Sequence, residues 1–277
     1  MLNILNVREK LKQFYIEDNH HGDISTQIFG AGLTGHAEMI ARESGYFSGS
    51  VVIEEGFRMI DPDMAVEVLL EDGRAVREGD TIARISGSIR AILTMERTVL
   101  NLVQRMSGIT TQTREFVEQA AGTGAEIIDT RKTTPGLGMF EKYAVTAGGG
   151  RNHRRTLNDG LMLKDNHIDF MGSVGAAVGR ARMLTGPMDK VEVEIEDVEM
   201  LKEAVDNDVD IIMFDNCATG WIREHIHLVP PHIRTEASGG ITLDTVKEYA
   251  ETGVDYISAG ALFHHQEALD ITLKVVK

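Results

Sequence analysis

Basic residues gather in one stretch of an otherwise acidic chain. The whole chain of 277 residues has a formal net charge of −15, yet the stretch from Arg131 to Lys164 carries seven basic residues against only Glu141 and Asp159. The seven are Arg131, Lys132, Lys142, Arg151, Arg154, Arg155 and Lys164. A nucleic acid needs an extended basic surface, which a chain of this net charge does not favour. The stretch therefore predicts a compact, cationic site for a small, highly charged anion.

Alternating strand and helix patterns surround this basic stretch. The candidate strands are residues 126–128, 161–163, 191–195, 210–214, 233–236 and 255–258. The candidate helices are residues 140–147, 173–184, 198–205, 221–227 and 242–251. Strands separated by helices at this spacing predict right-handed βαβ crossovers and a parallel sheet that curls into a barrel.

Each candidate strand ends in a polar residue or a glycine. These residues are Asp129 and Arg131, then Lys164, Glu194, Asp215, the run Ser238-Gly239-Gly240, and Gly260. Active sites of such barrels are built at the carboxyl ends of the strands, and phosphate is often held by the last two loops. A glycine pair alone indicates only a turn, but its place before a helical segment favours backbone N–H groups that face a phosphate.

The first 105 or so residues have the pattern of an α+β unit. Helical spacing covers residues 7–16, 50–60 and 88–106, a strand is expected at 37–42, and residues 69–85 have the turn signals of a β meander. In the segment 88–106 an apolar stripe that includes Met95 and Val99 predicts a buried helix face. Arg97 lies on the opposite face, so periodicity alone indicates a solvated surface arginine.

Composition excludes several classes of protein. The single cysteine, Cys217, allows no disulfide within the chain, and its type favours a small buried apolar residue over a nucleophile. No apolar run reaches about 18 residues, and the first residues have helical spacing rather than the apolar block of a signal peptide. We therefore expect a soluble, cytoplasmic protein that binds no membrane. GGGRNH is not the GxGxxG of a dinucleotide site, which disfavours an oxidoreductase.

Seven motifs give the sequence a family resemblance. They are TRKTTPGL, EKYAV, GGGRNHR, LKDNHI, VEVE, FDN and ASGGI, in this order. Over nearly its whole length the chain resembles the quinolinate phosphoribosyltransferases, most specifically in residues 129–168. The resemblance implies a type II phosphoribosyltransferase-like α/β fold. An N-terminal α+β sandwich domain (1–106, joined by 266–277) precedes an incomplete (β/α) barrel (107–265), in a homodimer or higher homo-oligomer with interfacial active sites.

The resemblance also implies a reaction. Quinolinate and phosphoribosyl pyrophosphate react with Mg²⁺, and without an organic cofactor, to give nicotinate mononucleotide, pyrophosphate and CO₂. Arg131, His153, Arg154 and Lys164 are then expected to bind quinolinate, and Arg97 to reach the site from the neighbouring subunit. Arginine forks suit the two adjacent carboxylates of quinolinate.

The second substrate is assigned a different set of residues. Lys132 and Lys164 suit the phosphates, while Glu194 and Asp215 suit Mg²⁺, directly or indirectly, and the ribose hydroxyls. The remaining expected substrate contacts, mostly the 5′-phosphate cradle, are Thr130, Ser238, Gly239, Gly240, Ala259, Gly260 and Ala261. The expected catalytic residues are Arg131, His153, Lys164, Glu194 and Asp215. His153 has an alternative role as a structural hydrogen bonder that orients its loop. The sequence shows no second residue for a proton relay, so His153 is not assigned as a general base.

Two departures from the family pattern and two rival functions remain. Gly138 stands where the family commonly has arginine, and Arg155-Thr156 where it often has a glycine. One rival is the molybdenum-transport-associated branch of the same fold, which tends to lose the residues matching Asn152 and Lys164; both are present here. The other rival is a non-catalytic sensor that binds a sugar phosphate.

Overall fold

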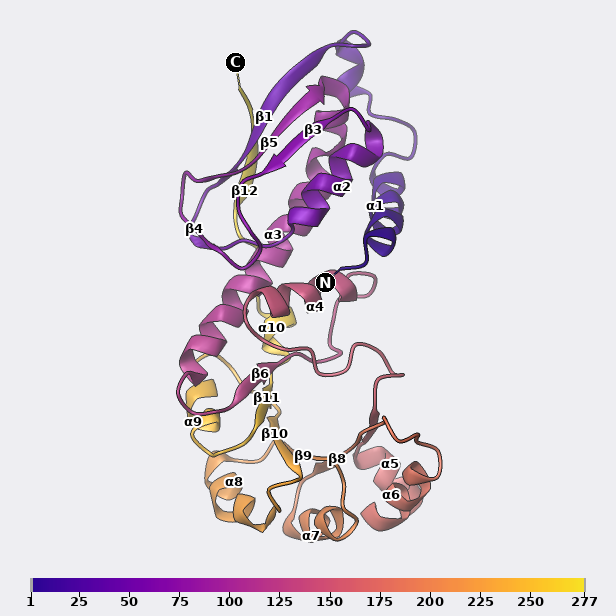
Figure 1. Cartoon of the computed structure of the whole chain (residues 1–277), viewed down its shortest axis with the longest axis vertical. Coiled ribbons are helices and arrows are strands. Elements are labelled where there is room, and N and C mark those ends of the chain that lie inside the picture. Colours follow the sequence, from indigo (N-terminus) through magenta and orange to yellow (C-terminus); the bar gives the residue numbers. More distant parts are fainter. Residues whose placement is uncertain (1, 277) are drawn as a thin grey trace. The chain divides into compact units, whose positions relative to one another are not determined.

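The structure is a computed structural model that describes residues 2–276, and it divides into two compact units (Figure 1). The first unit contains residues up to 112, residues 136–149 and the segment from 266 onward, and the second contains residues 113–135 and 150–265. This division differs from the predicted one in two respects. The predicted boundary was at residue 106, and residues 136–149 were predicted to belong to the barrel domain. Side-chain contacts explain the second difference, because the hydroxyl of Tyr143 donates to Asp72 (2.6 Å) and Glu141 forms an ion pair with Arg105 (2.6 Å).

The first unit is built on a four-stranded antiparallel sheet. The strand order is β12 (Ile271–Val276), β1 (Thr34–Ala41), β5 (Thr81–Ser88) and β3 (Ala65–Val68). The C-terminal segment enters the sheet through β12, where Leu273 lies opposite Met39 of β1. A second, two-stranded sheet joins β2 (Gly45–Tyr46) to β4 (Ala75–Val76).

Helices complete the first unit. They are α1 (Ile4–Asp18), α2 (Ser50–Ile60), α4 (Gly138–Ala147), the short 3-10 helix Ser25–Ile28 and most of the long helix α3 (Ile89–Ala120). Helix α2 packs on β3, and α1 packs on α2. The predicted apolar stripe of α3 is confirmed, because Met95 and Val99 are fully buried, while Arg97 is exposed on the other face.

The second unit is built on a six-stranded parallel sheet. The strand order is β6 (Glu126–Ile128), β11 (Tyr256–Ser258), β10 (Arg234–Ser238), β9 (Ile211–Asp215), β8 (Val191–Ile195) and β7 (Leu161–Leu163). An isolated parallel bridge between Ile128 and Arg151 extends it beyond β6. Among the described residues no ladder joins β6 to β7, so the barrel is incomplete, as predicted. All six predicted strands are present.

Short helices follow the strands of the second unit. They are α5 (Asp165–Met171), α6 (Val174–Arg182), α7 (Val198–Asp206), α8 (Thr219–His225) with the 3-10 helix Ile226–Leu228, α9 (Val246–Ala250) and α10 (Ala261–His264). Helices α6 to α9 lie on the outer side of the sheet (Figure 1). Helices α5 and α10 were not predicted from the sequence. Both are too short to show an apolar stripe over several turns.

Strand β8 shows how the barrel places side chains. All five residues of Val191–Ile195 are buried. Successive side chains of a strand point to opposite faces, so the two glutamates share one face and the three apolar residues share the other. Glu192 and Glu194 line cavities of this unit, which identifies their face as the inner one. The apolar residues therefore face the covering helices.

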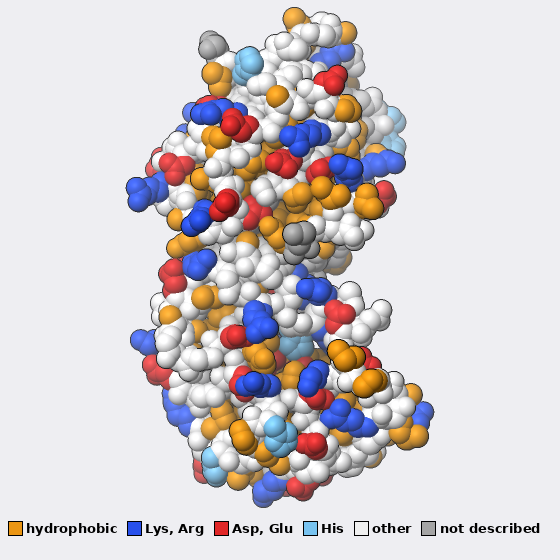
Figure 2. Space-filling model, in the orientation of Figure 1, with side chains coloured by type: hydrophobic (Ala, Val, Ile, Leu, Met, Phe, Trp, Pro, Cys, Tyr) orange, Lys and Arg blue, Asp and Glu red, His pale blue; other side chains and the backbone are white. Residues whose placement is uncertain are grey.

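The outer surface is mixed in charge, and no helix in the described part of the chain is both long and apolar enough to cross a membrane. On the face seen in Figure 2, Lys and Arg side chains lie among Asp and Glu side chains. That face offers no broad basic surface.

We predict that Phe214→Ala will lower the free energy of unfolding by about 3–5 kcal/mol, because the ring is fully buried in β9 and its loss leaves a cavity. Phe170→Ala is the matched control, since 92 % of that side chain is exposed, and its effect should stay within about 0.5 kcal/mol. Urea unfolding of both variants measures the difference. Equal losses would show that the burial assigned to Phe214 is wrong.

Candidate active site

A cavity of about 520 Å³ lies at the carboxyl ends of the parallel strands. It is lined by Asp129, Thr130, Arg131, Lys132, His153, Arg154, Met162, Lys164, Asp165, Glu194, Met213, Asp215, Asn216, Glu236, Ser238, Gly239, Gly240, Ser258 and Gly260. These residues come from the ends of all six strands and from the loop that follows Arg151. This edge is where (β/α) barrels bind substrates.

Most of the predicted site residues line this cavity. The twelve that do are Thr130, Arg131, Lys132, His153, Arg154, Lys164, Glu194, Asp215, Ser238, Gly239, Gly240 and Gly260. Ala259 and Ala261 are not among the lining residues; Ala259 is buried and its N–H donates to the carbonyl of Ile128 (3.3 Å). Arg97 belongs to the first compact unit and also lies outside the lining.

The charge of the cavity differs from the predicted cationic pocket. Four basic residues line it, but so do five carboxylates, from Asp129, Asp165, Glu194, Asp215 and Glu236. The count along the chain was misleading because strands distant in sequence bring acids to the same place. Lys142, Arg151 and Arg155 lie outside the lining. The cavity therefore combines fixed cations with carboxylates.

Lys164 and Glu194 form the central ion pair of the cavity. The ammonium of Lys164 contacts Oε1 of Glu194, and the backbone N–H of Lys164 donates to Nδ1 of His167 (3.0 Å) at the start of α5. Burial raises the pKa of Glu194, and the charge of Asp215 adds to this, against the lowering effect of Lys164. A further cation near Glu194 and Asp215 would relieve this repulsion.

A glycine-rich turn forms another wall. Gly239 and Gly240 have φ values of +97° and +63°, which favour glycine, and the N–H of Asn216 donates to the carbonyl of Ser238 (2.9 Å). A Cβ on Gly239 would lie 2.2 Å from Oδ1 of Asn216. Helix α9 begins only at Val246, later than predicted, so the turn rather than a helix start adjoins the cavity.

Arg131 and Arg154 form the basic side of the cavity. Burial, together with the nearby positive charge of Arg131, lowers the pKa of Arg154. The side chain of Arg154 is held by a contact between Nη2 and the sulfur of Met162 (3.6 Å). Two arginines close enough to repel each other suit a ligand with two adjacent negative charges.

The loop that carries Arg154 is held by Asp129, which follows β6. One carboxylate oxygen of the buried Asp129 accepts from the backbone N–H of His153 (3.0 Å), and the other accepts from the side-chain amide of Asn152 (2.7 Å). The backbone N–H of Arg154 donates to Nδ1 of the His153 ring (2.8 Å). The sequence pattern indicated Asp129 only as a strand end, not as this anchor.

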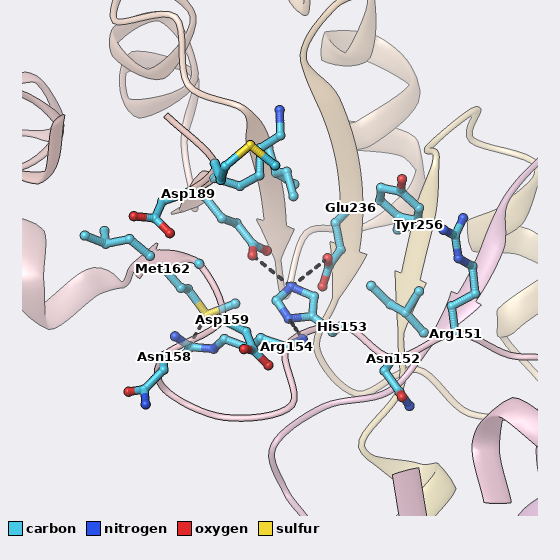
Figure 3. Close-up of a pocket in the computed structure, with 17 residues that line it drawn as sticks. Arg151, Asn152, His153, Arg154, Asn158, Asp159, Met162, Asp189, Glu236 and Tyr256 are labelled. Carbon is cyan, nitrogen blue, oxygen red and sulfur yellow. Dashed lines mark hydrogen bonds and ion pairs between the residues drawn. The ribbon is translucent and has the colours of Figure 1, made fainter. Parts of the chain in front are cut away.

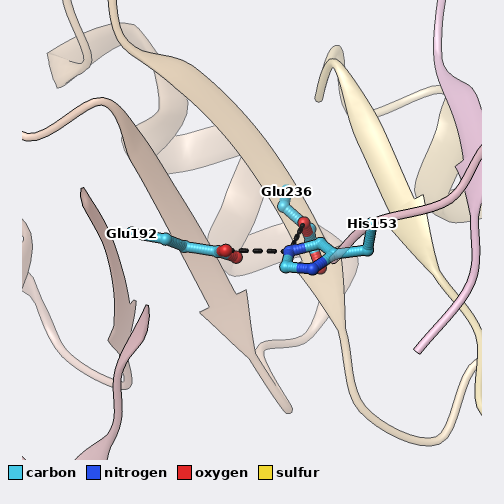
Figure 4. Close-up of side chains that lie close together, drawn as sticks. All are labelled: His153, Glu192 and Glu236. Carbon is cyan, nitrogen blue, oxygen red and sulfur yellow. Dashed lines mark ion pairs between the residues drawn. The ribbon is translucent and has the colours of Figure 1, made fainter. Parts of the chain in front are cut away.

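The ring of His153 lies between two buried glutamates (Figure 4). Its Nε2 is 2.8 Å from Glu192 and 3.4 Å from Glu236. Burial disfavours a charged ring, but these carboxylates outweigh it and raise the pKa of His153. Nδ1 thus accepts a hydrogen bond within the chain, and Nε2 lies at ion-pair distance from two carboxylates. This geometry favours the structural alternative for His153, which orients its loop, over direct contact with substrate.

Glu192 and Glu236 are the residues that sequence reasoning missed. A usable signal was present, because Glu192 lies two residues before Glu194, and Glu236 two before Ser238, so each shares the inner face of its strand. The other unpredicted lining residues include Met162, Met213, Asn216 and Ser258. Alternation marks inner positions, but it does not say which of them meet in space.

A second cavity, of about 510 Å³, lies at the amino ends of the strands (Figure 3). Residues at or next to strand starts line it, including Leu161, Lys190 and Ile211. It shares His153, Arg154, Met162 and Glu236 with the first cavity. The cluster around His153 therefore lies inside the barrel between the two cavities. Few of the predicted substrate residues reach the second cavity.

Three further positions are settled by the geometry. Burial, with the charges of Asp215 and Glu196, raises the pKa of the Cys217 thiol to about 11, which makes it a poor nucleophile. Gly138 begins α4, and the N–H groups of Arg155 and Thr156 donate to Asp159 (2.9 and 3.3 Å). None of the departures from the family pattern lies in the cavity lining.

Comparisons with known proteins agree with this description. Two family models match successive parts of the chain: the N-terminal domain of quinolinate phosphoribosyl transferase at residues 23–107, and its C-terminal domain at residues 109–274. The solved NadC of Streptococcus pyogenes superposes with a TM-score of 0.94 at 38 % identity, covering 100 % of this chain and 99 % of that chain. The nicotinate-nucleotide pyrophosphorylase of Francisella tularensis gives 0.95 at 33 % identity, covering 100 % and 98 %.

Curated relatives point the same way. A probable nicotinate-nucleotide pyrophosphorylase (carboxylating) of Bacillus subtilis is 46 % identical over 274 residues, which cover 99 % of this chain and 95 % of that protein. The corresponding protein of Mycobacterium leprae is 38 % identical over 275 residues, 96 % of each. Fold and relatives together define the class, an α/β phosphoribosyltransferase. More narrowly, the chain belongs to the quinolinate phosphoribosyltransferase family.

We predict that Gly239→Ala will destabilise the protein by about 1–3 kcal/mol, because alanine at positive φ is strained and its Cβ would overlap Asn216. Gly220→Ala is the control. Gly220 lies in α8, where an added Cβ would have nothing within 4 Å, so the change should be neutral or slightly stabilising. Thermal and urea unfolding compare the two. An unchanged midpoint for Gly239→Ala would contradict the turn geometry.

Proposed function

We propose that this chain transfers the phosphoribosyl group of phosphoribosyl pyrophosphate to quinolinate and decarboxylates the product, giving nicotinate mononucleotide, pyrophosphate and CO₂. One observation carries the proposal: Arg131, Arg154 and Lys164 line one cavity together with Glu194 and Asp215. The family membership and the printed names of the relatives support the same reaction. The reaction would serve the biosynthesis of NAD.

Quinolinate recognition rests on the two arginines. Each guanidinium offers a planar fork of donors. The effect of Arg131 on the pKa of Arg154 indicates that the two charges lie close together. Two adjacent carboxylates on a pyridine ring match such a pair. Loss of one charge-assisted contact should cost about 1.5–3 kcal/mol of binding.

Recognition of the phosphoribosyl donor rests on Lys132 and on the glycine-rich turn. Lys132 lies along Gly260, since a Cβ there would be 3.0 Å from Cδ of the lysine, and its ammonium suits a phosphate. The turn Ser238-Gly239-Gly240 also lines the cavity, and its two glycines have no side chains to cover the backbone there. Exposed backbone groups together with a flexible ammonium suit a phosphate group better than a pyridine ring.

Glu194 and Asp215 fit a magnesium site. Oxygen donors are the ligands that Mg²⁺ prefers, and burial, with a smaller contribution from the charge of Asp215, raises the pKa of Glu194, so a bound cation would favour its charged form. When bound, Mg²⁺ would supply positive charge for the pyrophosphate. The chain itself would hold the ion through Glu194 and Asp215, keep Lys164 close to both substrates, and orient the pyridine nitrogen toward the ribose carbon.

The chemistry then follows from position and charge. The ring nitrogen attacks the anomeric carbon as the bond to pyrophosphate breaks, and the nitrogen becomes positively charged. The bond between the ring and the adjacent carboxylate breaks next, CO₂ leaves, and the electron pair stays on a carbon that the charged nitrogen stabilises. That carbon finally takes up a proton. The reaction needs no covalent enzyme intermediate, and the raised pKa of Cys217 makes its thiol a poor nucleophile, so positioning and electrostatics suffice.

We also propose a homodimer or higher homo-oligomer in the cytoplasm, in which Arg97 of one subunit completes the site of another. Its support is the family resemblance and the exposure of Arg97 on α3, which leaves its guanidinium accessible to another subunit. The single cysteine fits a reducing compartment.

We predict that the purified protein will release labelled CO₂ from carboxyl-labelled quinolinate only when phosphoribosyl pyrophosphate and Mg²⁺ are both present. Removal of Mg²⁺ with a chelator should abolish release, because the pyrophosphate charge is then not neutralised. Nicotinate serves as the comparison substrate, since it lacks the second carboxylate that the two arginines read, and it should form little nucleotide. Binding of both substrates without CO₂ release would favour a sensor instead.

We predict that Arg97→Ala and Lys164→Ala will each abolish turnover, but that a mixture of the two will regain activity. In a hybrid dimer one site has both wild-type residues, so random exchange should restore about a quarter of the wild-type sites. Differently tagged subunits measure the exchange. Inactive mixtures with proven exchange would rule out a site shared between subunits.

A further inference from the structure

Two buried glutamates inside the barrel remain without a role in the proposed reaction. Glu192 of β8 and Glu236 of β10 are 4 % and 0 % exposed and flank the ring of His153 (Figure 4). Among the described residues, both oxygens of Glu236, Oε1 of Glu192 and Nε2 of His153 have no partner of hydrogen-bond geometry, although the three side chains lie at ion-pair distance. Burying a carboxylate is costly unless it is paired or hydrogen-bonded, so these two need an explanation.

The backbone N–H of Arg154 determines which nitrogen of His153 carries a proton. This N–H lies 2.8 Å from Nδ1, so Nδ1 is an acceptor. The carboxylates favour a charged ring, but a second proton on Nδ1 would have to break the contact with Arg154. The ring proton therefore resides on Nε2, which faces Glu192 (2.8 Å) and Glu236 (3.4 Å).

We propose that Glu192 and Glu236 are positioning residues for Arg154, and that they act through the His153 ring. The inference rests on the proposed function, in which Arg154 reads a carboxylate of quinolinate. The glutamates hold the proton on Nε2 and thereby make Nδ1 an acceptor for the Arg154 backbone. A carboxylate that fixes a histidine tautomer in this way is a familiar device in catalytic sites.

The surrounding contacts show why Arg154 needs this support. Burial and the charge of Arg131 disfavour the charged form of Arg154, while the charges of Glu192 and Glu194 favour it, so this guanidinium depends on its surroundings. Asp129, which follows β6, holds the preceding residues, through the N–H of His153 (3.0 Å) and the amide of Asn152 (2.7 Å). Carboxylates from β8, from β10 and from the residue after β6 thus converge on residues 152–153. Small displacements of a binding group cost affinity steeply.

A metal ion is the competing explanation for this cluster. One histidine and two glutamates with ligand atoms within 4.8 Å of one another have a composition that metals use. A histidine ligand must offer a lone pair, however, and Nε2 carries the ring proton as long as Arg154 donates to Nδ1. The tautomer therefore favours positioning over metal binding.

The first test compares two substitutions of Glu192 in the full-length enzyme. Glu192→Met removes the acceptor at similar volume and should raise KM for quinolinate about tenfold, with KM for phosphoribosyl pyrophosphate unchanged within about twofold. Glu192→Gln keeps an acceptor oxygen and should recover most of the lost affinity. Glu236→Met, at the longer distance, should act in the same direction with a smaller effect.

A matched control separates positioning from a general loss of folding. Asp255→Asn removes a half-buried carboxylate of the same unit that accepts from Thr235 and Arg234 and lies outside both cavities. It should lower the midpoint of unfolding without raising KM for quinolinate relative to KM for phosphoribosyl pyrophosphate. Equal changes in both KM values for Glu192→Met would overturn the proposal.

A double mutant tests the route through Arg154. In an Arg154→Ala background, Glu192→Met should add little further increase in KM for quinolinate, because the residue it positions is gone. Full additivity would contradict the proposal. If Glu192→Met does not fold, the wild-type protein still gives an answer, since ¹⁵N NMR of labelled histidine should show the His153 proton on Nε2 alone. Protonation of Nδ1, or a ring nitrogen shifted by a bound metal that a chelator removes, would overturn it.

The outcomes remain distinct from those of the proposed function. A wild-type protein that releases no CO₂ from quinolinate would refute the proposed reaction. An active wild-type protein whose Glu192→Met variant keeps its KM for quinolinate would refute only the positioning role.

Discussion

The parallel direction of six strands is the constraint on which the site depends. Parallel strands bring all their carboxyl ends to one edge of the sheet, so residues as distant in sequence as Asp129 and Gly260 line one cavity. The two-residue period of each strand then decides what enters the barrel. In β8 it turns the apolar side chains toward the covering helices and sends Glu192 and Glu194 inward.

Much of the fold was predictable because its signals are local. Short apolar runs between turns gave all six parallel strands, and the stripe through Met95 and Val99 gave the buried face of α3. The division into units was less accessible. Residues 136–149 lie in the first unit because Tyr143 and Glu141 contact partners far away in sequence, and no local pattern encodes those contacts.

The residues of the site also include some that the sequence could predict and others that it could not. Basic residues cluster within one segment of the chain, and four of the seven line the cavity, so a basic component of the site could be predicted from the sequence. The carboxylates come one at a time from separate strands. Glu194 and Asp215 were predicted as site residues, but Asp165 and Glu236 were not, so the cavity is more acidic than the basic segment indicated. His153 shows the consequence. The family resemblance gave it a substrate contact, with a structural role as the alternative. The glutamates near its Nε2 come from two other strands and become visible only in three dimensions.

The mixture of charges explains how a site for anions can be lined with acids. Burial and the nearby charge of Arg131 lower the pKa of Arg154, so a cation in this cavity is less favourable when another cation lies beside it. A cation anchored by a carboxylate is held before the substrate arrives, and Lys164 on Glu194 is such a case. The anchor weakens the net attraction for an anion, but it reduces the freedom that binding would otherwise remove. The inward glutamates therefore lower the affinity for anions but fix the positions of the cations. Fixed positions matter most where two substrates must react with each other.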